Sequence, residues 1–139
     1  MKVLYIDETK LAEAWPHAAP WIEKAVVRGG GDYPLQDAYA DIESGRKKLF
    51  KAINGKDFAW LLLGVNESSE SKTAILFSIG GKGVFNFIEK LDEFCNAYAI
   101  LNGCEHIAAT GRRGWKESLA KLGWKDVSVI YKKEVQYGR

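Results

Sequence analysis

Two neighbouring arginines, Arg112 and Arg113, are the residues of this chain best suited to chemistry with an anion. They stand in the segment Ala109-Thr-Gly-Arg-Arg-Gly-Trp115, between a short apolar stretch and the beginning of a helical pattern. A guanidinium group binds phosphate or carboxylate through paired hydrogen bonds, and the N-terminus of a helix adds the positive end of its dipole. The segment predicts an anion site, most simply for a phosphate. A pair of solvated arginines is the alternative.

A second candidate anion site is the glycine segment Gly80-Gly-Lys-Gly83, which precedes the clearest helical pattern of the chain. Glycines allow a ligand to approach the backbone closely, so their amides can bind an anion, and Lys82 adds a positive charge. The alternative is a strand-to-helix turn that requires glycine for its backbone conformation alone. A single glycine-rich loop does not decide between the two.

Candidates for acid–base chemistry are few. Glu67 lies in a polar turn and His106 begins a short apolar stretch, and either side chain could act as a general base. A solvated turn residue and a hydrogen-bonded structural histidine are the respective alternatives. Cys95 and Cys104 have no neighbouring base in the sequence and no spacing typical of a metal site, so both are interpreted as reduced packing residues.

Apolar periodicity predicts the elements that must position these residues, in the order β-α-α-β-β-α-β-α-β. Pro16 and Pro20 predict a kink or a break in the first helix. The basic residues of the 46–51 segment are assigned to the solvated side of the second helix. The expected strands are 3–6, 58–65, 73–79, 106–110 (buried) and 127–131, and the expected helices are 11–26, 35–53, 84–101 and 115–122, with a flexible break at 80–83.

Length and composition restrict the class of protein. The chain has 139 residues, which predicts a single domain spanning 1–139. Its formal net charge of +2 makes a nucleic-acid partner unlikely. Neither a signal peptide nor an apolar run long enough to cross a membrane is evident, so a cytoplasmic location is expected.

The element order and the C-terminal residues resemble the GCN5-related N-acetyltransferase (GNAT) family. The most specific match runs from Gly103-Cys-Glu-His-Ile-Ala-Ala-Thr-Gly-Arg-Arg-Gly-Trp115 through Leu119-Ala-Lys-Leu-Gly-Trp124, which is similar to small GNAT-like proteins of tailed bacteriophages and prophages. The resemblance implies an α/β fold with a mixed, centrally splayed β-sheet flanked by helices on both faces. It also implies that acetyl-CoA lies in the splay, held by Phe77, Ser78, Ile79, Gly80, Gly81, Lys82 and Gly83 together with Arg112 and Arg113.

Two departures from the family pattern concern catalysis. Many active members carry a tyrosine, four residues before the glycine of a closing Leu-Gly-Phe motif, that protonates the leaving thiolate; the matching residue here is Leu119. The glycine segment also lacks the family's usual Gln/Arg-x-x-Gly-x-Gly/Ala pattern. The resemblance therefore implies acetyl transfer from acetyl-CoA to an amine of unknown identity. The alternative is a noncatalytic phage protein, a virion component or host-interaction module, located in the host cytosol or the virion and assembled as a homo-oligomer or in the particle.

Overall fold

The computed structural model describes residues 1–28, 32–110, 113–127 and 131–137 of the chain. Its five-stranded sheet has the order β1-β2-β3-β4-β5, in which the first four strands are antiparallel neighbours and β4 pairs with β5 in parallel. The parallel pair and the antiparallel β3–β4 hairpin confirm the expectations from the sequence. The strands are β1 (Lys2–Ile6), β2 (Lys47–Asn54), β3 (Asp57–Glu67), β4 (Lys72–Lys82) and β5 (His106–Ala109).

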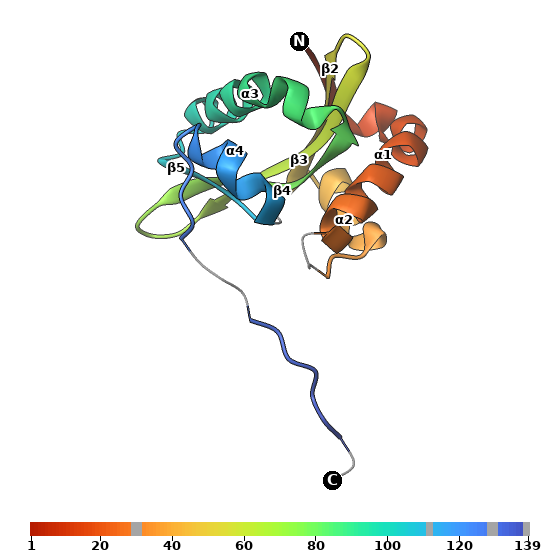
Figure 1. Ribbon diagram of the computed structural model, residues 1–139. Coiled ribbons are helices and arrows are strands. Elements are labelled where there is room, and N and C mark those ends of the chain that lie inside the picture. Colours follow the sequence, from red (N-terminus) through yellow and green to blue (C-terminus); the bar gives the residue numbers. More distant parts are fainter. Residues whose placement is uncertain (29–31, 111–112, 128–130, 138–139) are drawn as a thin grey trace.

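Helices cover both faces of the sheet, as predicted (Figure 1). One face packs against α1 (Glu8–Arg28) and α2 (Leu35–Glu43), with Leu62 and Trp60 at the centre of that core. The other face packs against α3 (Ile88–Leu101), which a short 3-10 turn, η1 (Val84–Phe87), precedes. A second 3-10 turn, η2 (Arg113–Trp115), leads into the short helix α4 (Lys116–Ala120) on the α3 side. The central strand β3 is accordingly buried on both faces.

The predicted second helix at 35–53 is wrong beyond Glu43. The helix ends there, a turn containing Gly45 at a φ of 81° follows, and residues 47–54 form β2. Apolar residues in this segment serve both faces of the sheet, because Leu49 packs toward α1 and α2 whereas Phe50 and Ala52 pack toward α3. Their spacing fits a helical stripe by coincidence, and the basic residues of this segment lie on or beside a strand.

Other boundaries also differ from the prediction. Of the two alternatives expected for the prolines, the break is wrong, because α1 runs from Glu8 to Arg28 as one helix that is anchored to the sheet by Leu11, Ala18 and Ile22. Strand β4 continues through Gly80, Gly81 and Lys82, so the expected flexible break is wrong for these residues. The described part of the predicted last strand, Val127 and Tyr131, is exposed and unpaired, and residues 131–137 extend away from the sheet (Figure 1). Without a neighbouring strand edge, their alternating pattern forms no ladder.

Within the described ranges, no helix combines the length and apolar character that a membrane span needs.

Candidate active site

The sheet opens between β4 and β5. These strands pair only from Thr73 to Leu76 on β4, because β5 has four residues whereas β4 has eleven. Beyond Leu76, β4 keeps β3 on one side, and its other edge borders a cleft of about 400 Å³. The splay predicted from the family resemblance is therefore present, and an extended ligand could lie along this strand edge in the manner of an added strand.

The cleft brings together residues of α1, β4, η1, α3, the end of β5 and the α4 region. The β4 edge and η1 form one wall, α1 and α3 close its two sides, and the end of β5 and α4 face β4 across the opening. Its lining is mostly apolar and aromatic, which is typical of small-molecule sites. The lining includes Trp21, Lys24 and Arg28 of α1, Phe77, Ser78, Gly80 and Gly81 of β4, Gly83, Phe85 of η1, Asp92 and Cys95 of α3, and Trp115, Leu119 and Trp124 near the C-terminus.

A β-bulge lies where the splay begins. Leu62 pairs with Ser78 while its neighbour Leu63 pairs with Leu76, which leaves Phe77 as an extra residue of β4. A bulge bends its strand and redirects the side chains and amides around it. The bulge therefore positions Phe77, Ser78 and the glycines that follow at the point where β4 and β5 separate.

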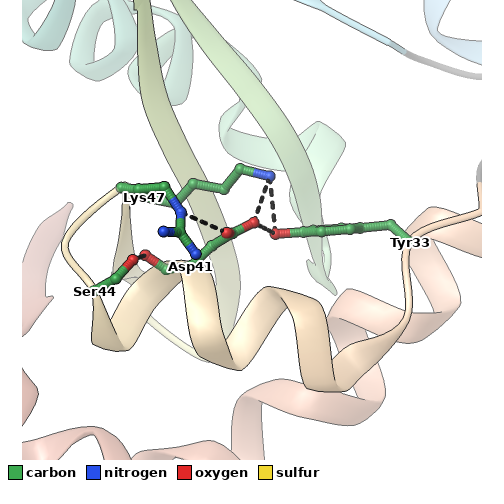
Figure 2. Close-up of polar contacts among 5 residues, drawn as sticks. Tyr33, Asp41, Ser44 and Lys47 are labelled. Carbon is green, nitrogen blue, oxygen red and sulfur yellow. Dashed lines mark hydrogen bonds and ion pairs between the residues drawn. The ribbon is translucent and has the colours of Figure 1, made fainter.

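A partly buried lysine, Lys47, lies over the Phe77 ring and also contacts Tyr33 and Asp41, the two partners that Figure 2 shows. The Lys47 ammonium lies 3.7 Å from the centre of the Phe77 ring and 4.0 Å from that of the Tyr33 ring. It also donates a hydrogen bond of 2.8 Å to the Tyr33 hydroxyl and forms a 3.2 Å ion pair with Asp41. Gly64 makes room for this arrangement, since a Cβ at that position would lie 2.9 Å from Phe77 Cε2.

The charges in this cluster stabilise one another. The Tyr33 hydroxyl donates a hydrogen bond to Asp41, and this bond, with those from Arg46 and Lys47, lowers the pKa of the Asp41 carboxyl to about 2. Burial, followed by the interaction with Asp41, raises the pKa of Tyr33 above its ordinary value. Near neutral pH the cluster therefore holds an ionised carboxylate, a neutral phenol and a cation between two rings. We interpret it as a support for the bulge.

Ser78 carries a polar group that the folded chain does not satisfy. Ser78 is one of the residues that line the cleft and is 6% exposed, and its buried Oγ has no hydrogen-bond partner among the described residues. A buried hydroxyl without a partner costs about 1 to 3 kcal/mol. A ligand that hydrogen-bonds to Oγ would recover that cost, so this residue fits a site for a polar, extended molecule such as the pantetheine part of acetyl-CoA.

The glycines at the end of β4 serve close packing. A Cβ on Gly80 would lie 2.6 Å from the Trp21 carbonyl oxygen, and one on Gly81 would lie 2.0 Å from that of Phe58. Gly83 has a φ of 68°, and the carboxylate of Asp57 is packed directly against it while accepting a 3.1 Å hydrogen bond from Asn86 Nδ2. This negative charge opposes a phosphate on the amides of the turn. The turn therefore fits a pyrophosphate poorly.

Groups that could transfer a proton are scarce in the cleft. None of the described residues that line it is a histidine, tyrosine or glutamate, and Leu119 occupies the position at which the family resemblance implies a tyrosine. Burial, with the nearby charge of Asp92, raises the pKa of the Cys95 thiol to about 12, so this thiol is protonated at neutral pH. The Asp92 carboxylate accepts a 2.7 Å hydrogen bond from Trp124 Nε1, which ties α3 to the segment after α4.

The structure brings together some predicted site residues and separates others. Six of the seven β4 and turn residues line the cleft: Phe77, Ser78, Ile79, Gly80, Gly81 and Gly83. Lys82 is exposed outside the lining. Glu67 is exposed at the hairpin end of β3, opposite Lys72, and His106 is the exposed first residue of β5; neither lines the cleft.

The expected burial of β5 is wrong, because only Ile107 of its four residues is partly buried and no strand covers its outer edge among the described residues. Arg112 and the side chain of Arg113 lie outside the described part of the chain, so their predicted role in anion binding stays a prediction.

Sequence reasoning missed the contribution of α1 to the cleft. Lys24 and Arg28 are four residues apart, and both line the cleft beside Trp21. The spacing was a usable signal, since residues four apart share a helix face. The sequence did not reveal that α1 packs across β4 at Gly80, which brings its last turns to the cleft.

Comparison with solved structures identifies the fold. Similar structures include a probable acetyltransferase, with 12% identity over 100% of this chain and 99% of the other and a TM-score of 0.69. An aminoglycoside acetyltransferase from an uncultured soil metagenomic sample has 14% identity, covers 97% and 96% of the two chains and gives a TM-score of 0.66. A GCN5-related N-acetyltransferase from Ralstonia eutropha JMP134 has 14% identity, 96% and 97% coverage and a TM-score of 0.66.

No protein-family model and no curated protein matches the sequence. The similarity to solved structures shows that the chain has the GNAT fold, with a mixed five-stranded sheet that opens between β4 and β5 and helices on both faces.

Proposed function

We propose that this protein is an acyl-CoA-dependent N-acetyltransferase, which moves an acetyl group from acetyl-CoA to an amine. The observation that carries the proposal is the edge of β4 beyond Leu76, which pairs with no strand among the described residues and borders a cleft of about 400 Å³. Ser78, whose hydroxyl is unsatisfied, is one of the residues that line this cleft. Neighbours of the same fold that are named acetyltransferases support it. Fold similarity alone leaves the acceptor amine open.

In this mechanism the chain binds and orients the reactants. Acetyl-CoA supplies a thioester, whose carbonyl carbon a neutral amine can attack. The backbone of β4 from Phe77 to Gly81 would hold the pantetheine and the carbonyl oxygen, and the bulge at Phe77 would set their position. Ser78 Oγ would contribute one hydrogen bond from the floor of the cleft.

Proton transfer is the weak part of this site. A positioned acid or base contributes about 100- to 10,000-fold to a rate. With Leu119 at the family's tyrosine position, water would have to take the proton that the attacking amine loses and deliver one to the leaving thiolate. We therefore expect slow transfer from the native chain.

The proposal is tested by calorimetric titration with acetyl-CoA, followed by detection of the CoA thiol released in the presence of a panel of amines. Leu119→Tyr is expected to raise kcat by about 10- to 100-fold, because it supplies a phenol at a position that lines the cleft. Leu119→Phe is the matched control, since it adds the ring without the hydroxyl. Absence of acetyl-CoA binding at millimolar concentration by the folded protein would contradict the proposal.

A second candidate is a noncatalytic GNAT-fold module, and the proton-poor lining of the cleft favours it. The phage origin and the virion or host-interaction role implied by the sequence resemblance belong to this candidate. Binding of acetyl-CoA without transfer in either the native chain or Leu119→Tyr would support it over the enzyme.

A further inference from the structure

We propose that Lys24 and Arg28 of α1 bind the phosphate groups of the acyl-CoA, in place of the glycine turn at the end of β4. The inference rests on the proposed function and concerns which residues of this chain recognise the charged part of the ligand. Three features of the cleft support it: the close packing and negative charge at the glycine turn, the position of α1, and the distribution of charged residues in the lining.

The turn is poorly suited to an anion. Gly80 and Gly81 are packed against the carbonyl oxygens of Trp21 and Phe58, so the absence of their side chains is already explained by close contacts. The carboxylate of Asp57 lies against Gly83, at the N-terminal end of η1. A phosphate on the amides there would face a negative charge at short range, which is unfavourable even in a solvated position.

Helix α1 brings positive charge to the same part of the cleft. Its Trp21 contacts Phe58 of β3 edge to face, at 5.3 Å between ring centres, and both Trp21 and Ala25 lie against Gly80 of β4. The helix therefore runs from β3 across β4, and its last turns reach the cleft that borders β4. Lys24 and Arg28, one turn apart on this helix, are exposed and line that cleft.

The charge balance of the cleft favours an anionic ligand near α1. Among the described lining residues, Lys24 and Arg28 are the cations, and Asp92 on the opposite helix is the carboxylate. Asp92 is engaged by Trp124, whereas neither cation has an ion-pair partner within the described ranges. A guanidinium and an ammonium at this spacing can hold a phosphate together, the first as a fork and the second as a point charge.

The test compares two ligands that differ in phosphate. Acetyl-CoA and S-acetyl-pantetheine, which has the same thioester arm without phosphates, are titrated calorimetrically into the native protein and into Lys24→Ala/Arg28→Ala. The double variant is expected to bind acetyl-CoA about 10- to 100-fold more weakly and S-acetyl-pantetheine with unchanged affinity. Lys10→Ala/Lys121→Ala is the control, because it removes two exposed charges outside the cleft lining.

Each alternative result has a distinct meaning. Unchanged acetyl-CoA affinity in Lys24→Ala/Arg28→Ala would overturn the inference and leave the proposed function intact. Equal weakening of both ligands would also overturn it, since the residues would then act on the shape of the cleft. If neither ligand binds the native protein, the proposed function fails as well. Lys24→Arg/Arg28→Lys, which keeps both charges, is expected to retain most of the affinity for acetyl-CoA.

Discussion

Removing the Ser78 hydroxyl is expected to stabilise the free protein and to weaken ligand binding. Oγ is buried without a partner among the described residues, and such a group costs about 1 to 3 kcal/mol in the folded state. Ser78→Ala removes this cost and leaves only a one-atom space in a cleft wall. We expect a gain of about 1 kcal/mol in the free energy of unfolding.

Urea unfolding measures the first effect. With a slope of about 2 kcal/mol per molar urea, a gain of that size raises the midpoint by about 0.5 M. Calorimetric titration measures the second effect: loss of one hydrogen bond to the ligand is expected to weaken acetyl-CoA binding about 2- to 10-fold. The opposite signs distinguish a functional hydroxyl from one that merely fills space.

Ser68→Ala is the matched control, because the Ser68 hydroxyl is exposed and accepts a 3.1 Å hydrogen bond from the backbone N–H of Ser71. That variant is expected to be neutral or slightly destabilised, with unchanged ligand binding. If Ser78→Ala lowers the urea midpoint at an unchanged slope, the hydroxyl is paired in the folded protein and the reasoning is refuted.

Three further predictions follow from the packing and the charges. Gly80→Ala is expected to destabilise the fold by about 1 to 3 kcal/mol in urea unfolding, because its Cβ would lie 2.6 Å from a backbone oxygen. Gly114→Ala is the control and should change stability little, since a Cβ there would meet nothing within 4 Å. Equal effects of the two substitutions would contradict the packing argument. The folded-state pKa of Asp41 is lowered to about 2, so the stability that its carboxylate contributes is present above its ordinary pKa of 3.8 and is lost as pH falls toward 2. The difference in free energy of unfolding between the native protein and Asp41→Asn should therefore shrink by about 1 to 2 kcal/mol across that window. A constant difference would argue against the ion pair. Cys95, with a pKa of about 12, should resist thiol reagents at pH 8 until the protein unfolds, while the partly exposed Cys104 reacts first; rapid labelling of Cys95 would show that α3 opens.

Local sequence patterns predicted those elements whose apolar residues are all buried, or all lie on one face that packs against a single core. Strand β3 is apolar throughout because both of its faces are covered, and the stripe on α3 faces one core. The same patterns gave the wrong prediction for β2. Leu49 and Phe50 pack into different cores, and their combined spacing matches that of a helical stripe. Which face a residue serves depends on where the helices pack, and a single segment does not contain that information.

The candidate site was predictable on β4 and unpredictable on α1. A serine and two glycines within an apolar strand are local signals, and all three line the cleft. The charge of Asp57 against Gly83 and the approach of Lys24 arise from contacts between segments distant in the sequence. The sequence alone leaves phosphate binding and a backbone requirement open for the glycines, and close packing against Trp21 and Phe58 accounts for two of them.

The difference in length between β4 and β5 explains why the cleft suits an extended ligand with amide groups. Pairing with β5 ends at Leu76, so the following residues of β4 present backbone N–H and C=O groups to the cleft on the side away from β3. Shielding these groups from water without giving them hydrogen-bond partners costs free energy. A ligand that lies along the edge and carries its own amides would satisfy them while its apolar parts cover Phe85 and Trp115, whose tilted rings line the cleft with their centres 4.6 Å apart. The pantetheine arm has this character, whereas a compact amine alone would leave the edge unpaired. For this reason the acyl donor, more than the acceptor, is the ligand that the geometry of the cleft favours.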